Sequence, residues 1–128
     1  MSVVVHKASA VPPQNPAFSH AIETAPGARL IHISGQIGAR EDGSFHDDFE
    51  DEAAQAFANL EAVLKSIGLT AHNIVRFTIY LTRREDSDAM RQARNRFMQG
   101  HAPAMTLLYV AGLVDPKVHI ELEATAAA

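Results

Sequence analysis

The sequence predicts a single α+β domain, with two helices packed on one face of a mixed six-stranded sheet. Three observations support this prediction. The chain has 128 residues, 47% of them hydrophobic and 20% charged, which is typical of one domain with a buried core. Residues 49–67 carry an apolar stripe at helical spacing. Segments rich in β-branched and aromatic residues lie on both sides of this helix. We therefore expect the order β-β-β-α-β-α-β-β.

The N-terminal part is expected to form strands joined by turns. Residues 3–6 are predicted to be a short edge strand, and three prolines within residues 8–16 predict an irregular connector. Alternating polarity predicts a second strand over residues 18–23. Pro26-Gly27 then predicts a hairpin turn, with residues 30–34 as the returning strand.

Two helices are predicted from periodicity and end signals. The first is expected to be capped by one of the acids at 47–48 and to end at Gly68. The second is expected to be capped at residues 86–87 and to end at Gly100. The apolar stripe of the first helix consists of Phe49, Ala53, Ala56, Phe57, Leu60, Val63, Leu64 and Ile67, and that of the second of Met90, Ala93, Phe97 and Met98.

The remaining strands are predicted over residues 74–82, 106–110 and 118–124. Each helix can supply a crossover between parallel neighbours, so both helices are expected on the same face of the sheet. Several strands carry apolar residues on both faces, and leaving the second face wet would cost roughly 25 cal/mol per Å² of apolar area. We therefore expect self-association to cover that face. The residues concerned are Leu30, Ile31, Ile33, Leu107, Leu108 and Val110.

The bulk composition argues against several classes of protein. A formal net charge of -4 argues against nucleic acid as the main partner, because phosphate binding needs clustered Lys and Arg. The absence of cysteine excludes disulfides, thiolate nucleophiles and thiolate metal sites. Residues 1–7 are too short and polar for a signal peptide, and no apolar run reaches the ~20 residues that cross a bilayer. We expect a cytoplasmic protein with no membrane partner.

No metal or cofactor is expected. The seven histidines show no spacing typical of a helical zinc motif, and Ser34 lies in no Gly-x-Ser-x-Gly pattern. The sequence contains no Walker-type or dinucleotide Gly-rich loop, so nucleotide cofactors are not expected either.

Three short segments carry a resemblance to a known family. They are Ser-Gly-Gln-Ile-Gly at 34–38, Pro-Ala-Met-Thr at 103–106 and Ile-Glu-Leu-Glu-Ala at 120–124. Their order and spacing resemble the RidA/YjgF family, also called L-PSP endoribonuclease-like, over most of the chain, and residues 34–43 are most similar to its YjgH-type branch. The resemblance implies a chorismate mutase-like fold, a homotrimer and ligand clefts between neighbouring subunits.

The resemblance also implies roles for two residues. Glu121 would position or activate the water that attacks an imine carbon, and one carboxyl group can both take and supply the protons required. Gly35 would contact the ligand carboxylate, since the backbone beside Ser34 and Gly35 is not shielded by a side chain. Alternation along the strand places Glu121 and Glu123 on the same face. The alternatives are that Gly35 only permits a strand end, and that both acids are solvated or lie in a subunit interface.

This sequence departs from the deaminase pattern at three positions. Met105 stands where deaminases carry the arginine that holds the substrate carboxylate, and a thioether cannot replace its paired hydrogen bonds. Phe18 replaces a tyrosine, so that Met105, Phe18 and Leu107 would form an apolar wall. Arg91 replaces an asparagine and could restore a carboxylate partner. The alternatives are that Met105 only fills space, and that Arg91 lies with Arg94 and Arg96 on an exposed helix face.

The resemblance, together with these departures from it, leaves three hypotheses for the function. The first is a divergent family member that binds a small enamine, imine or keto acid between subunits. In this hypothesis Glu121 positions or activates the attacking water, and backbone groups of Gly35 and Leu107 hold the ligand. The second is a non-catalytic trimer that binds or senses a metabolite. The third is an endoribonuclease, which the acidic net charge argues against.

Overall fold

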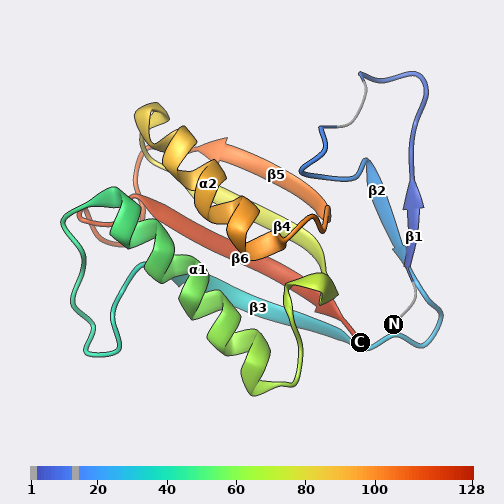
Figure 1. Cartoon of the computed structure of the whole chain (residues 1–128), viewed down its shortest axis with the longest axis horizontal. Helices are drawn as coiled ribbons and strands as arrows, with labels where there is room; N and C mark the ends of the chain where they lie inside the picture. The colour runs from blue at the N-terminus through green and yellow to red at the C-terminus, as the bar shows by residue number, and fades with distance from the viewer. Residues whose placement is uncertain (1–2, 13–14) are drawn as a thin grey trace.

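A four-stranded mixed sheet forms the body of the protein in the computed structural model, which describes residues 3–12 and 15–128 (Figure 1). The last two strands in spatial order are parallel, and the other neighbours are antiparallel. The spatial order is β3 (Leu30–Ile37), β6 (Ile120–Ala127), β4 (Ile74–Leu81) and β5 (Ala104–Tyr109).

Two helices, α1 (Phe49–Ser66) and α2 (Ser87–Met98), cover the same face of this sheet (Figure 1). α2 is the crossover between the parallel strands β4 and β5, whereas α1 joins β3 to β4, which are separated by β6. The α+β fold class, the mixed sheet and the placement of both helices on one face are thus confirmed.

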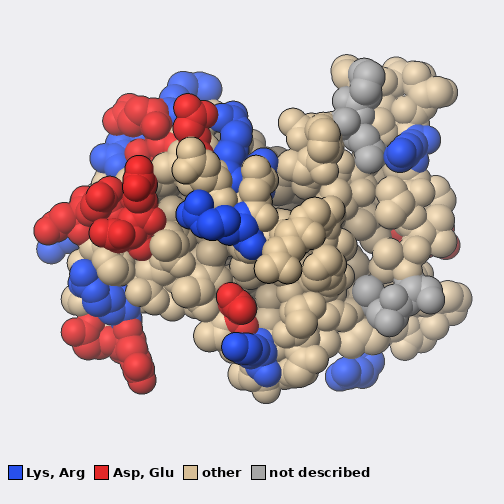
Figure 2. Space-filling view, in the orientation of Figure 1, with Lys and Arg blue, Asp and Glu red and all other residues tan. Residues whose placement is uncertain are grey.

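The charged residues are unevenly distributed on the visible surface, where Asp and Glu gather at the end at which α1 begins (Figure 2).

The first two strands form a separate sheet, so the prediction of one six-stranded sheet was wrong. β1 (Val3–His6) and β2 (Ala21–Thr24) pair antiparallel with each other and lie apart from the body (Figure 1). The turn at Pro26-Gly27 forms, with Gly27 at a φ of 79°, but it joins strands that do not pair. β3 pairs with β6 instead, which brings Ile33 into the core under the helices. Part of the predicted connector, residues 13–14, lies outside the described residues.

α1 follows its sequence signals closely. The side chain of Asp48 caps it by accepting the backbone N–H of Glu50 at 3.1 Å. Gly68, at a φ of 74°, adopts the left-handed conformation just beyond the helix end. The stripe residues buried in the core are Phe49, Ala53, Ala56, Phe57, Leu60 and Leu64.

α2 begins and ends differently from the prediction. The short 3₁₀ turn η2 (Arg84–Asp86) leads into it, and Asp86 makes no side-chain capping bond. The carboxylate of Asp86 instead accepts from Nε of Arg83 at 2.7 Å. At the other end Gln99 is already left-handed, with a φ of 47°, before Gly100. A second 3₁₀ turn, η1 (Ala71–Asn73), leads into β4.

The face of the sheet away from the helices carries mostly polar side chains, and the expected apolar residues on this face are confirmed at Leu30 and Leu108. The alternation of side chains sends the apolar residues of β4 and β6 toward the helices. Leu30 and Leu108 remain as exposed apolar side chains, 51% and 42% accessible. The polar side chains on this open face come from every strand of the sheet and are His32, Arg76, Thr78, Tyr80, Thr106, Glu121, Glu123 and Thr125. Within the described part of the chain, no helix has the length and apolar character needed to span a bilayer.

Candidate functional site

Glu121 and Gly35 lie against each other on the open face of the sheet. Residues 34 and 35 form an irregularity in the pairing of β3 with β6, which lies between Ile33 and Gln36. A Cβ built on Gly35 would come within 2.8 Å of Cδ of Glu121 and closer still to its Oε2. Glycine at position 35 therefore leaves the space that the Glu121 carboxylate occupies.

A second acid shares this face, as alternation along β6 predicts. The hydroxyl of Tyr80 donates to Oε1 of Glu123 at 2.8 Å. This hydrogen bond raises the pKa of Tyr80 above its ordinary value, and burial and the negative charges of Glu123 and Glu121 raise it further. Glu123 is thus engaged by a neighbour, whereas among the described residues no side chain donates a hydrogen bond to Glu121. Glu121 is the better placed of the two to act on a ligand.

Met105 and Leu107 lie on the other face. In the parallel register Met105 is opposite Phe77 and Leu107 opposite Ile79, both of which are core residues under the helices. The two side chains are partly buried and pack against this core. Since Glu121 and Gly35 are on the open face, one chain does not bring its Met105 and its Glu121 together. A site containing both would need a second copy of the chain.

The other predicted site residues are dispersed. Phe18 is half-buried and lines a cleft with Val11, Pro12 and His20 of the N-terminal arm. Ser34 is exposed, and its carbonyl accepts from Nε2 of Gln36 at 3.1 Å. Arg91 is exposed and pairs with Asp88 at 3.0 Å, one helical turn earlier.

Arg94 differs from its neighbours, which corrects its assignment to an exposed helix face. It is buried, whereas Arg91 and Arg96 are exposed. The signal was present in the sequence, because Met90, Arg94 and Met98 recur every four residues and both methionines belong to the core. The polar character of arginine hid this periodicity.

The described residues include no group of three or more His, Asp or Glu side chains placed to hold a metal ion. His119, for example, contacts another side chain of the fold, with its Nδ1 2.9 Å from Oγ1 of Thr82. The arrangement on the open face is a carboxylate, that of Glu121, beside the backbone of Gly35.

Comparison with known proteins places this geometry in a family. The model described as Endoribonuclease L-PSP matches residues 8–128. A 2-iminobutanoate/2-iminopropanoate deaminase of Rattus norvegicus is 33% identical over 98% of this chain and 93% of its own length. The RutC family protein YjgH of Escherichia coli (strain K12) is 42% identical, but over 41% of this chain and 40% of its own length. Some of the curated relatives thus match over about half of their length or less.

A solved structure extends the likeness to the whole fold. A protein of unknown function of the conserved Rid protein family, YyfB from Yersinia pestis, superimposes with a TM-score of 0.88 at 31% identity and full coverage of both chains. Together with the match of the family model to residues 8–128, this shows that the chain is a member of the RidA/YjgF (Rid) family.

Proposed function

We propose that this chain binds a small enamine, imine or keto acid in clefts between the subunits of a cytoplasmic homotrimer. We further propose that it hydrolyses imines or enamines with a specificity different from that of its deaminase relatives. The observation that carries the proposal is the contact between the Glu121 carboxylate and Gly35 on an open sheet face. The relatives called 2-iminobutanoate/2-iminopropanoate deaminase supply the reaction class.

The proposed reaction uses the Glu121 carboxylate as the base that activates a water molecule. Glu121 takes a proton from water while the water oxygen bonds to the imine carbon, and the imine nitrogen receives a proton. The resulting carbinolamine then loses ammonia: its C–N bond breaks, the C=O bond forms, and Glu121 passes the hydroxyl proton to the departing nitrogen. The products are one carbonyl compound and one ammonia per imine and water consumed.

The positions of the proposed site residues support a site that a second subunit completes. Met105 and Leu107 face the helices on edge strand β5, while Glu121 and Gly35 face away from them on the other strands. A neighbouring copy that brings its open face to the β5 edge would join the two halves. Analytical ultracentrifugation should give about three times the mass of the 13.9 kDa chain, and a monomer would contradict this arrangement.

Met105 supports altered specificity. It cannot pair with a carboxylate, so a substrate with an apolar group would be favoured at this wall over a small anion. The same residue favours the second candidate, a trimer that binds a metabolite without turnover. The two differ in one measurement, because saturable binding of a keto acid without any release of ammonium would favour the binding module.

The test is an assay of ammonium release from imines formed in situ from apolar and small amino acids by an amino-acid oxidase. We expect Glu121→Gln to lower the rate at least about 100-fold, as loss of a general base does. Glu123→Gln, on the same strand and face, is the matched control and should retain most activity. Equal rates for Glu121→Gln and the unmodified protein would refute the mechanism.

The Met105→Arg variant tests the inherited cleft. It should raise the rate with 2-iminobutanoate, since a guanidinium pairs with a carboxylate through two parallel bonds. An intact trimer with no gain would count against a ligand cleft at this position. Cleavage of RNA by highly purified protein, lost in high salt, would instead support the endoribonuclease reading.

A further inference from the structure

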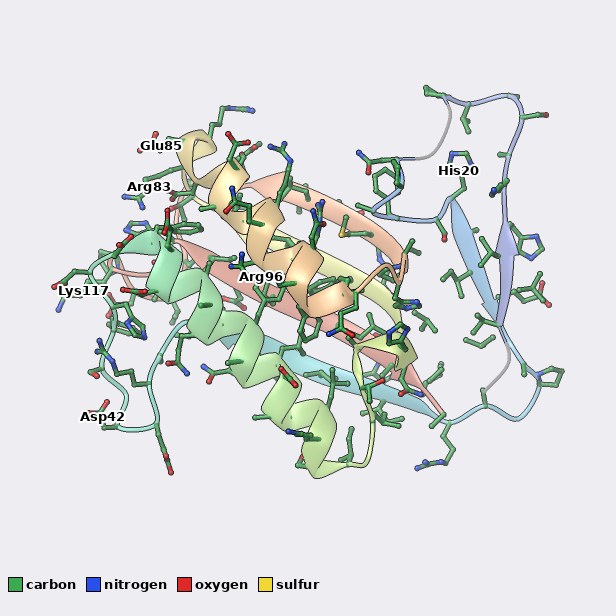
Figure 3. All side chains as sticks on the ribbon, viewed as in Figure 1. His20, Asp42, Arg83, Glu85, Arg96 and Lys117 are labelled. Atoms are coloured by element: carbon green, nitrogen blue, oxygen red, sulfur yellow. The ribbon has the colours of Figure 1, made fainter. Side chains whose placement is uncertain are left out.

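The guanidinium of Arg94 is buried without a carboxylate partner. The residue is 9% accessible, and no Asp or Glu of the described residues forms an ion pair with it. Its Nε and Nη2 reach the amide oxygen of Asn95 at 3.4 and 3.3 Å, which are long hydrogen bonds. Burying a charge without a counter-ion costs free energy, so we expect a negatively charged partner to compensate the guanidinium. Arg96, labelled on the same helix in Figure 3, is exposed.

Arg94 lines a cleft of about 250 Å³ beside the second half of α2. The opposite wall is the connector that leads to the N-terminal arm. Ser19 fixes this connector to the start of β5, since its N–H donates to Pro103 O at 3.0 Å and its hydroxyl to Ala102 O at 2.6 Å. The cleft thus lies between two anchored elements and is lined by Asn15, Pro16, Ala17, Arg94, Asn95, Met98, Gly100 and His101.

The polar groups of this lining are mostly hydrogen-bond donors. Oδ1 of Asn15 accepts the backbone N–H of Ala17 at 2.8 Å, and Oδ1 of Asn95 accepts from Arg94. Because a backbone N–H and a guanidinium can only donate, these bonds settle which amide atom is the oxygen. The NH₂ groups of both asparagines then remain as donors, with no acceptor among the described residues. None of the lining residues is acidic.

The surroundings of Arg94 add positive potential. Burial lowers the pKa of the Arg94 guanidinium, and the positive charge of Arg91 one turn earlier lowers it further. An arginine remains protonated at neutral pH in spite of such shifts. The negative charge of an anion in the cleft would offset both unfavourable contributions, whereas a neutral ligand carries no charge to offset them.

We propose that this cleft is a binding site for a small carboxylate, held by paired hydrogen bonds from Arg94 and by the side-chain amides of Asn15 and Asn95. The planar guanidinium matches the geometry of a carboxylate better than that of a single-atom ion. A volume of about 250 Å³ lies below the roughly 300–1,000 Å³ of drug-sized sites, so the ligand is a compact acid. All the groups come from one chain, so this site does not depend on Glu121 or on the proposed reaction.

The test uses ¹⁵N-labelled protein titrated with pyruvate and, separately, with its uncharged methyl ester. We expect pyruvate to shift the side-chain NH₂ signals of Asn15 and Asn95 in a saturable way, and the ester to bind at least tenfold more weakly. Arg94→Met should weaken pyruvate binding at least tenfold, with Arg94→Lys in between. Arg96→Met removes the same charge from the exposed side of α2 and should bind like the unmodified protein.

Three results with the variants and the methyl ester would overturn the proposal. They are unchanged pyruvate affinity in Arg94→Met, equal binding of pyruvate and its ester by the unmodified protein, and an equal loss in Arg96→Met. Sulfate that displaces pyruvate at the same concentration would likewise show a general anion site and not a carboxylate site. If Arg94→Met does not fold, the comparison of pyruvate with its ester and the pyruvate affinity of Arg94→Lys still test the proposal. If Arg94→Met binds pyruvate as the unmodified protein does, and the unmodified protein still releases ammonium from imines, this site is rejected and the proposed function is retained.

Discussion

Glu52 of α1 holds the backbone of His119 at the start of β6. Its Oε2 accepts the N–H of His119 at 2.7 Å and that of Ile120 at 3.2 Å. The glutamate is 3% accessible, so these bonds are shielded from water. They join the first turn of the helix to the strand that carries Glu121, one residue further along.

Replacing this carboxylate should destabilise the fold. Glu52→Ala leaves two backbone donors without a partner, which should lower the free energy of unfolding by about 2–4 kcal/mol. Urea unfolding followed by circular dichroism measures the loss. Glu50→Ala removes an exposed acid from the same helical turn and should cost less than about 1 kcal/mol. Equal effects of the two changes would show that the bonds to β6 contribute nothing.

Gly38 should be intolerant of a side chain for a related reason. A Cβ there would overlap the backbone oxygen of Glu52 and lie 2.6 Å from its Cγ. Since a backbone cannot move as a flexible side chain does, Gly38→Ala should cost about 1–3 kcal/mol in the same unfolding experiment. Gly112→Ala is the control, because a Cβ on Gly112 meets nothing within 4 Å. A stable Gly38→Ala protein would mean that α1 can shift away from β3.

Gly35→Ala should affect function more than stability. The new methyl group would meet the end of the Glu121 side chain, which can rotate away, so the protein should fold. The carboxylate would then leave its position over the backbone, and we expect ammonium release to fall at least tenfold. A protein with unaltered rate would show that the position of Glu121 over Gly35 is not needed.

Tyr80 should titrate above the ordinary tyrosine value of about 10. The chain has two tyrosines, so the difference in absorbance at alkaline pH between the unmodified protein and Tyr80→Phe isolates Tyr80. Glu123→Gln should bring the pKa of Tyr80 back toward its ordinary value by removing the negative charge. The hydrogen bond between Tyr80 and Glu123 should stabilise the fold fully at pH values below the pKa of tyrosine in the unfolded chain. This stabilisation should be lost as the pH rises through the pKa of Tyr80 in the folded protein. An unshifted titration in the unmodified protein would contradict the hydrogen bond.

The sequence predicted the parts of this protein that depend on near neighbours along the chain. The stripe of α1 and the Asp48 cap lie within a few turns of one another, so a local pattern contains the whole signal. The alternation of Glu121 and Glu123 is likewise a property of any strand. Family membership was also evident from the short segments around Gly35, Met105 and Glu121.

Tertiary structure alone decided the rest, because contacts between distant segments leave little trace in local pattern. Three acids open α1, and only packing against β6 makes Glu52 the buried one while Glu50 stays exposed. The strand at Ala21–Thr24 has the alternation of its neighbours, yet it pairs with β1 because β3 finds its partner some ninety residues away, in β6. The burial of Arg94 followed a helical period that its charge concealed. The local sequence pattern indicated the face of a helix or strand on which a residue lies. The elements that pack against that face were decided by the tertiary structure.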